Sequence, residues 1–302
     1  MENRVLRYFV EMANEKNMTR AAEKLHVTQP TMSRQLKELE EELGVKLFHR
    51  TNYAIRLTDE GEIFLRRAKD ILNLVDKTKA EFSGGTDPAR YALNIGCPET
   101  DSIKYVARAV QTLRRSGIPL VCHVHSGNAE DVLERLNKGL DDFSLVLDYV
   151  DTTRYHRIPL SAFETWGVIM KKDHPLAAKK RLTTDDLLTE SLIISRQAAE
   201  QIFPVWFGEN AERLQIAASF NLAFNGALFV REGIGIMITL DKLVHTGAYS
   251  DLVFRPMTGV ADAQLKLVWK KDQPQNQAAR LLIDAIRAEL GAGKDGTADE
   301  SQ

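Results

Sequence analysis

Cysteine is scarce in this sequence, and long apolar runs are absent from it. Two cysteines among 302 residues argue against a disulfide-stabilised secreted fold and fit a reducing cytosol. No run of about 18 apolar residues occurs, so we expect no membrane-spanning helix. The opening segment, MENRVLRYFVEMANEKN, lacks the continuous apolar core of a signal peptide. We therefore expect a cytoplasmic protein with no membrane partner.

A dominant charge of one sign is also lacking. The chain has 40 basic and 42 acidic residues, so only a local basic patch could indicate a nucleic-acid partner. It shows no nucleophile elbow, no glycine-rich phosphate loop and no paired acid and base, which argues against an enzyme and against a cofactor. What is present, 44% apolar and 27% charged residues, predicts a globular protein of two or three domains.

Three amphipathic helices are predicted at the start of the chain. The first covers residues 4–14 and has apolar side chains at helical spacing: Leu6, Phe9, Val10 and Ala13. Thr19 is the expected N-cap of the second helix and Thr28 that of the third, which Gly44 ends. The short turn between the second and third helices predicts a helix-turn-helix.

The third helix begins with short polar side chains and continues with two cations. In a helix-turn-helix the second helix enters the DNA major groove, and its first residues meet base edges. Gln29 can pair with adenine and Arg34 with guanine, while Lys37 can hold a phosphate. The acidic residues 38 and 40–42 follow further along, away from the helix start. A solvated helix in a small helical domain is the alternative interpretation.

A hairpin and a long helix are predicted next. Two short apolar runs around a polar turn, residues 45–58, predict the hairpin. From Thr58 onward, apolar positions at alternating spacings of four and three predict a coiled-coil seam: Phe64, Ala68, Ile71, Val75, Thr78 and Phe82. An amphipathic helix packed on its own domain is the alternative. The segment SGGTDP, residues 83–88, predicts a hinge.

The remainder of the chain alternates strands and helices, which predicts parallel sheets flanked by helices. His123 and His125 share one face of a strand, a spacing that can bind metal, but no third ligand is evident, so we expect no metal site. Cys97 and Cys122 lie on neighbouring strands at an expected offset of about three residues, or ~10 Å, too far for a disulfide.

Residues 19–65 resemble the winged helix-turn-helix of the LysR-type transcriptional regulators, and the resemblance covers roughly residues 1–85 specifically and the remainder by layout. The matching features are the Ala21-Ala22 pair, the TQPTMSRQL segment, the Leu39-Glu40 pair, Gly44, and the LFHR and LTDEG segments. The resemblance implies that the start of the third helix faces the major groove and that the wing tracks the minor groove. Together with the helix cap, the expected DNA-binding residues are Thr28, Gln29, Pro30, Thr31, Ser33, Arg34, Lys37, Arg50 and Arg56. Wings of the family often contain glycine, whereas this one has TNYAI, in which Asn52 best tolerates a left-handed turn.

The resemblance also implies an α+β multidomain architecture. A winged helix-turn-helix (1–58) is followed by a dimerisation helix and hinge (59–89) and a bilobed α/β effector domain like periplasmic binding proteins (90–291). Lobe one would comprise 90–162 and 267–291, lobe two 163–266, with a disordered tail over 292–302. The implied partners are an inverted-repeat site in double-stranded DNA, a small-molecule effector, a second copy in a dimer or tetramer, and RNA polymerase.

Ligands of open α/β sheets bind beyond the carboxyl ends of strands, where helices begin. This rule gives the expected effector-binding residues: Pro98, Glu99, Thr100, Asp101, Ser102, Ser126, Asn128, Ser195, Arg196, Phe220 and Asn221. Thr100, Asn128 and Asn221 can equally be helix caps. Arg196 favours an anionic effector, whereas Glu99 and Asp101 favour a cation, hydroxyl or amide, and the residues leave this open. A DNA-binding architectural protein, whose second half only oligomerises, is a further alternative.

Overall fold

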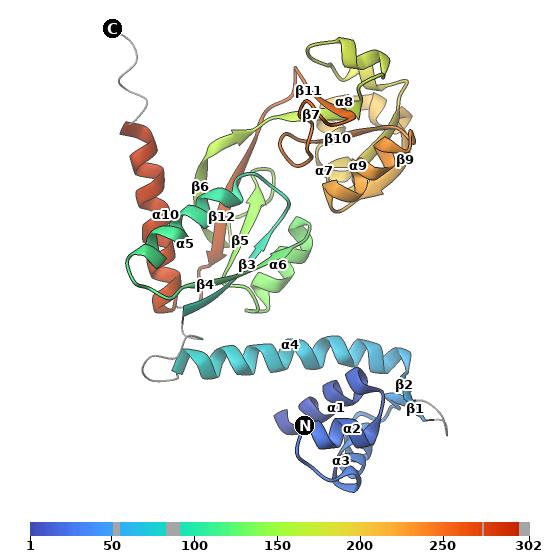
Figure 1. Ribbon diagram of the computed structural model, residues 1–302, viewed down its shortest axis with the longest axis vertical. Helices are drawn as coiled ribbons and strands as arrows, with labels where there is room; N and C mark the ends of the chain where they lie inside the picture. Colours follow the sequence, from blue (N-terminus) through green and yellow to red (C-terminus); the bar gives the residue numbers. More distant parts are fainter. Residues whose placement is uncertain (51–54, 83–90, 274, 296–302) are drawn as a thin grey trace. The chain divides into compact units, whose positions relative to one another are not determined.

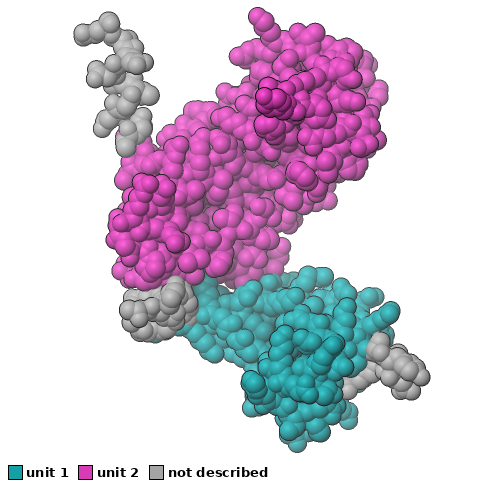
Figure 2. Space-filling view, in the orientation of Figure 1, with its two compact units in different colours: residues 1–90 teal, residues 91–302 magenta. Residues whose placement is uncertain are grey.

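The computed structural model describes residues 1–50, 55–82, 91–273 and 275–295. The chain divides into two compact units, residues 1–90 and 91–302 (Figure 2). The predicted hinge, residues 83–88, lies outside the described residues, as does the wing turn at residues 51–54. Among the described residues, no helix has both the length and the apolarity needed to cross a bilayer.

Unit one contains the predicted helices and hairpin (Figure 1). Its elements are α1 (Asn3–Glu15), α2 (Met18–Lys24), α3 (Gln29–Leu43), β1 (Phe48–Arg50), β2 (Ile55–Leu57) and α4 (Asp59–Phe82). The expectation that Thr19 caps α2 was wrong. Asn17 is the N-cap, and its side-chain oxygen accepts a hydrogen bond from the Arg20 amide at 3.1 Å.

The core of unit one joins the hairpin and α4 to the first helix. The ring of Phe9 lies 5.1 Å from that of Phe48 and 4.8 Å from that of Phe64, measured between centroids. Ala68 and Ile71 of α4 belong to the same core. The first half of the predicted seam therefore packs within its own unit, as the alternative interpretation stated, whereas Thr78 and Phe82 are exposed.

Unit two contains two five-stranded sheets, which define two lobes. Lobe one has the strand order β4-β3-β5-β12-β6, with β3 parallel to β4 and β5 and with β12 antiparallel to β5 and β6. Its elements are β3 (Ala92–Cys97), α5 (Ile103–Arg115), β4 (Val121–Ser126), α6 (Ala129–Asn137), β5 (Phe143–Leu147), β6 (Tyr155–Glu164), β12 (Ala263–Lys270) and α10 (Gln277–Asp295).

Lobe two has the order β11-β7-β10-β8-β9, in which β8 is parallel to β9 and β10 and in which β7 is antiparallel to β10 and β11. Its elements are β7 (Trp166–Lys171), η2 (Pro175–Ala178), η3 (Asp185–Leu187), β8 (Ser191–Ser195), α7 (Arg196–Gln201), α8 (Phe203–Phe207), η4 (Gly208–Arg213), β9 (Gln215–Phe220), α9 (Ala223–Arg231), β10 (Ile236–Leu240) and β11 (Leu252–Pro256).

The chain crosses between the lobes twice, after Glu164 and again between β11 and β12 (Figure 1). All of β12 is hydrogen-bonded into lobe one, where Ala263 pairs with Glu164 and Gln264 with Phe163. Residues 163–164 and 263–266 therefore belong to lobe one, whereas we expected them in lobe two. Helix α10 continues to Asp295, where we expected a disordered tail from residue 292. Residues 296–302 lie outside the described part.

The register of β3 and β4 places the two cysteines. Cys97 pairs with Ser126, and Cys122 pairs with Leu93, so the offset is four residues instead of the expected three. Both cysteines are free. His123 and His125 lie on the exposed strand β4, and the described residues contain no group of three or more His, Cys, Asp or Glu side chains that could hold a metal.

Candidate nucleic-acid interface and effector cavity

The start of α3 is fixed by local hydrogen bonds, as its sequence predicted. The Thr28 hydroxyl accepts a hydrogen bond from the Thr31 amide at 3.4 Å, and the two threonine hydroxyls lie 2.8 Å apart. Gly44 ends the helix in the left-handed conformation, at φ 70°. The caps leave the first turn of α3 in a defined orientation, with Gln29, Pro30 and Thr31 exposed and Met32 buried in the core.

The predicted base-contacting residues are open to solvent. Ser33 is half-buried, and the others on α3 are exposed: Thr28, Gln29, Pro30, Thr31, Arg34 and Lys37. Arg34 pairs with Glu38 at 3.7 Å and Lys37 with Glu41 at 3.4 Å, both one turn away on the surface. Such exposed pairs stabilise a helix by only about 0.3–0.5 kcal/mol. Both cations are therefore free to exchange these partners for DNA.

Glu40 connects α3 to the wing, a role that the sequence did not reveal. Its buried carboxylate accepts hydrogen bonds from the amides of Leu47 (2.9 Å) and Phe48 (3.3 Å) and from Lys46 (3.1 Å). Burial alone would raise the pKa of Glu40, but these donors outweigh it and hold the pKa below its ordinary value. Glu40 thus belongs to the core, whereas its neighbours Glu41 and Glu42 are exposed.

The wing is a two-stranded antiparallel hairpin. Arg56 is exposed and lies opposite His49, and Arg50 lies opposite Ile55. The turn that contains Asn52 falls outside the described residues, so its left-handed conformation stays a prediction. The backbone of the wing is nevertheless anchored at its base, since Glu40 binds the amide of Phe48 where β1 begins.

A threonine and a glycine attach α4 to the wing. The Thr58 hydroxyl donates to the Lys46 carbonyl at 2.7 Å and accepts from the Gly61 amide at 2.9 Å. A Cβ atom at Gly61 would lie 2.1 Å from the Leu47 carbonyl oxygen, so a side chain does not fit there. This close approach of helix and wing explains why the LTDEG segment has a threonine at residue 58 and a glycine at residue 61.

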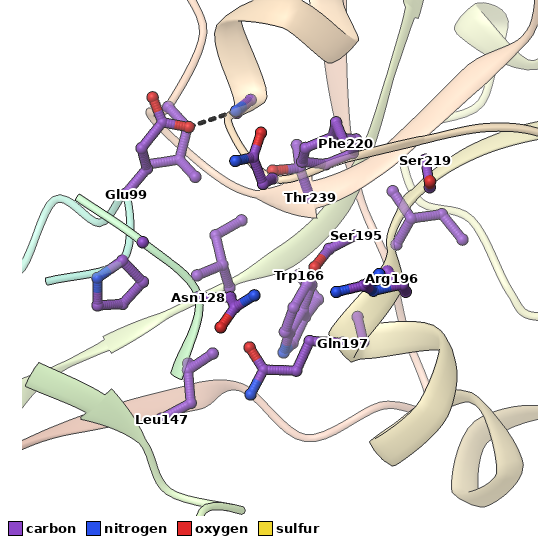
Figure 3. A pocket seen from close by; sticks show the side chains of 18 of the residues that line it. Glu99, Asn128, Leu147, Trp166, Ser195, Arg196, Gln197, Ser219, Phe220 and Thr239 are labelled. Carbon is purple, nitrogen blue, oxygen red and sulfur yellow. Dashed lines mark hydrogen bonds between the residues drawn. The ribbon is translucent and has the colours of Figure 1, made fainter. Parts of the chain in front are cut away.

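Unit two has a cavity of about 400 Å³ between its lobes (Figure 3). Of the expected effector-binding residues, the structure brings together those at its wall: Pro98, Glu99, Asn128, Ser195, Arg196, Phe220 and Asn221. Lobe one supplies the loops after β3 and β4, and lobe two supplies the start of α7 and the end of β9. The carboxyl ends of the strands thus converge here, as the rule for open α/β sheets predicted.

Thr100 and Ser102 do not line this cavity. Both are buried against Glu164, whose Oε1 accepts hydrogen bonds from the Thr100 hydroxyl, the Ser102 amide (2.8 Å) and the Ser102 hydroxyl (2.5 Å). The two side chains therefore fix the loop after β3 to the crossing strand β6.

Burial raises the pKa of the nearby Cys97 thiol to about 12, and the Glu164 charge adds to this, so Cys97 is an inert thiol.

Asp101 and Ser126 also lie outside the cavity wall. Asp101 pairs with Lys104 and, across the lobes, with Lys242 at 3.6 Å. The hydrogen bond from Lys104 is the largest cause that holds the pKa of Asp101 below its ordinary value. Ser126 is an exposed residue at the end of β4. The carboxylate of Asp101 is thus neutralised by lysines instead of by a ligand.

A side chain of each lobe accepts a hydrogen bond from the first turn of a helix in the other lobe. Glu99 of lobe one accepts a hydrogen bond from the Ala223 amide of α9, and Gln197 of lobe two accepts one from the Ala129 amide of α6 at 3.1 Å (Figure 3). Asn128 caps α6 by accepting from the Asp131 amide at 2.9 Å, as its alternative interpretation stated. The Glu99 and Gln197 contacts join the two lobes across the cavity.

Sequence reasoning missed most of the apolar wall. The additional lining residues include Asp131, Leu147, Tyr149, Trp166, Gln197, Ser219, Ile238, Thr239, Leu240 and Leu243. The same strand-end rule, applied to β5 and β10, would have found Leu147, Tyr149, Thr239 and Leu240. No signal marked Trp166, because it begins a strand of which most residues are apolar and buried.

Two family models match the chain over these two units. Residues 3–62 match the bacterial regulatory helix-turn-helix protein, lysR family, and residues 86–291 match the LysR substrate binding domain. The Hca operon transcriptional activator HcaR of Escherichia coli is 29% identical over 300 residues, which span 97% of this chain and 99% of HcaR.

Solved structures show the same fold. Full-length CbnR complexed with its target DNA matches with a TM-score of 0.70 at 20% identity, over 95% of this chain and 99% of CbnR. A full-length OxyR variant from Pseudomonas aeruginosa matches with a TM-score of 0.54 at 25% identity, over 95% and 98% of the two chains. The chain therefore belongs to the LysR family of bacterial transcriptional regulators, which are effector-controlled DNA-binding proteins and not enzymes.

Proposed function

We propose that this chain reads an inverted-repeat site in double-stranded DNA through the start of α3, and that a small molecule in the interlobe cavity controls the outcome. The observation that supports DNA binding is the exposed polar face of the first half of α3, whose start is held by the Thr28 cap. No acidic residue occurs between Lys24 and Lys37, so this surface suits a polyanion. The CbnR structure with target DNA supports the same use of the fold.

We assign the readout residue by residue. Gln29 and Arg34 have the side chains that pair with adenine and guanine in the major groove. Thr28, Pro30, Thr31 and Ser33 are short, so the helix start can approach the bases closely. Lys37, Arg50 and Arg56 would contact phosphates or the minor groove and add affinity with little sequence preference.

The interlobe cavity provides the site through which a small molecule would control DNA binding. A ligand that contacts both walls binds the closed arrangement of the lobes more tightly than an open one, so it shifts the population toward closure. Closure would change how the copies of the chain pair and hence the spacing of the two α3 helices on DNA. A cavity of this size, lined by both polar and apolar residues, argues against a purely architectural role.

Assembly follows from the inverted-repeat target, since a two-fold DNA site is matched by a two-fold protein dimer. The exposed apolar residues of α4, Ile63, Leu74 and Phe82, offer a surface for a second copy. We include tetramers and RNA polymerase among the proposed partners, the latter because the relative HcaR is a transcriptional activator. The chain would work in the cytoplasm, where bacterial DNA lies.

Selection of bound duplexes from a random DNA pool by the full-length chain tests this proposal. We expect an enriched inverted repeat whose half-sites are separated by whole helical turns. Enrichment of no sequence, or of a single unrepeated half-site, contradicts the proposed mode of recognition. Repeating the selection with a metabolite mixture tests control, because an effector should change either the affinity or the enriched spacing.

A further inference from the structure

The cavity holds one cation whose charge is not neutralised within the described residues. Arg196 is the first residue of α7, is exposed, and points toward the interior of the cavity (Figure 3). Within the described part of the chain, no carboxylate lies within salt-bridge distance of its guanidinium, and the first turn of α7 has no acidic residue. An arginine in such a position is suited to a planar carboxylate, which it can bind through two parallel hydrogen bonds.

The two carboxylates of the cavity are, in contrast, already compensated. Glu99 accepts the Ala223 amide at the start of α9, and Asp131 lies in the first turn of α6. A helix start carries a partial positive charge that stabilises an acidic side chain placed there. Neither carboxylate therefore requires a cationic ligand, and the uncompensated charge in the cavity is positive.

The uncharged part of the wall combines polar side chains, such as Asn128, Ser219 and Thr239, with an apolar and partly aromatic area. Trp166 and Phe220 face the cavity (Figure 3), and Leu147 and Leu243 line it as well. A flat apolar group would cover the parts of these side chains that reach the cavity and pack on the rings in the offset or edge-to-face arrangement that aromatic pairs favour. The wall thus provides a place for a ring next to the place for an anionic group.

We propose, building on the effector-controlled function above, that the cavity binds an aromatic monocarboxylate and that Glu99 excludes dicarboxylates. The ligand carboxylate binds Arg196, and its ring lies against Trp166 and Phe220. The start of α9 would be a second position for an anionic group, but Glu99 from the other lobe occupies it. A second ligand carboxylate there would meet the negative charge of Glu99 in a confined space. Glu99 is thus the residue that sets the number of charges on the effector.

Calorimetric titration of the full-length chain with four sets of probes tests this proposal. The probes are aromatic monocarboxylates (benzoate, phenylacetate and 1-naphthoate), the dicarboxylate terephthalate, the neutral benzamide and the cation benzylamine. We expect at least one monocarboxylate to bind about tenfold or more tightly than the other three classes, a difference of about 1.4 kcal/mol. Tighter binding of benzylamine, benzamide or terephthalate, or no binding by any monocarboxylate, overturns the proposal.

Two variants separate the roles of the charges. Arg196→Gln should weaken monocarboxylate binding about tenfold or more, while Arg213→Gln, the same change at an exposed residue outside the cavity wall, should not. Glu99→Gln keeps an acceptor for Ala223 but removes the charge, so terephthalate should gain about tenfold while the monocarboxylate changes little. Glu209→Gln is the matched control on the surface. Equal losses for both ligands in Glu99→Gln would overturn the assigned role of Glu99.

Different results would contradict the proposed ligand class and the proposed effector control of DNA binding. DNA binding by the full-length chain, measured by fluorescence anisotropy with each probe, reports on the proposed function. If a cation or a neutral metabolite changes DNA binding while the monocarboxylates do not, the ligand class assigned here is wrong and effector control stands. If the monocarboxylates bind but DNA binding never changes, the ligand class stands and effector control fails.

Discussion

At the scale of single residues, we propose Arg34 as a base-reading side chain of α3. It lies at the sixth position of α3, and its only partner among the described side chains is the exposed Glu38. Arg34→Ala should therefore cost about 1–3 kcal/mol of specific DNA binding and relax the preference at one base-pair position. Competition binding against operators substituted at each position measures both effects. Lys37→Ala is the control, since loss of a phosphate contact should weaken all sequences alike. A uniform loss in Arg34→Ala would contradict base readout.

Glu40 holds the start of the wing through the amides of Leu47 and Phe48. Glu40→Ala leaves the buried amide of Leu47 without its acceptor, so we expect a loss of about 1–3 kcal/mol in the free energy of unfolding of unit one. Denaturant titration followed by circular dichroism measures this loss. The control Glu41→Ala removes an exposed carboxylate of the next residue and should change stability little.

The Glu40 effect should also depend on pH. Because the folded state holds the pKa of Glu40 below its ordinary value of 4.5, the ionised carboxylate stabilises the fold. That contribution is complete above the ordinary value and is lost as the pH falls through the lower pKa of the folded state. The stability difference between the native chain and Glu40→Gln should therefore shrink as the pH falls below about 4.5. A difference that grows in acid would contradict the assigned ionisation.

The sequence predicted features whose cause is local and missed those whose partner is distant. Thr28 and Gly44 were identified because a cap acts within one turn of its own helix. The prediction of Thr19 was wrong because Asn17, two residues earlier, is an equally suitable cap, and its side chain accepts from the Arg20 amide. Glu40 and Thr100 were misjudged because their partners, the Leu47 amide and Glu164, come from other elements. The strand-end rule located the cavity but not which side of each loop faces it.

At the scale of elements, α4 approaches the segment that leads into the wing closely at Gly61. Gly61→Ala would place a Cβ atom 2.1 Å from the Leu47 carbonyl oxygen, so helix or wing must move. We expect a loss of about 1–3 kcal/mol in stability, as for other overpacked sites, and weaker DNA binding because the wing shifts. Gly291→Ala in α10 has open space around it and should be neutral or slightly stabilising. An unchanged melting temperature in Gly61→Ala would refute the close contact.

Helix α4 divides its apolar residues between two tasks. Phe64, Ala68 and Ile71 pack in unit one, while Leu74 remains exposed on another face. We therefore expect Leu74→Glu to weaken the dimer about tenfold or more without destabilising unit one, as a buried charge at an interface would. Sedimentation equilibrium measures the dimer, and Asn73→Glu, at the adjacent exposed position, is the control. Equal dimerisation of the two variants would remove α4 from the proposed interface.

At the scale of the whole effector-binding unit, the lobes are held by contacts that cross the cavity. Gln197→Ala removes the acceptor of the Ala129 amide and leaves the Glu99 contact in place, so the open arrangement should become more populated without ligand. Single-molecule energy transfer between dyes on the two lobes of the full-length chain would detect a longer mean distance. Gln201→Ala, at an exposed position of the same helix, should leave the distance unchanged.

The distance in the unliganded chain is the decisive measurement because Gln197 also lines the cavity. A weaker ligand response in Gln197→Ala could come from a lost ligand contact, whereas a longer distance without ligand can come only from the lost contact between lobes. If the distance is unchanged, the crossing contacts are incidental and closure must be driven by the ligand alone. If it increases, the chain contributes part of its own closing free energy, and the ligand has only the remaining difference to supply.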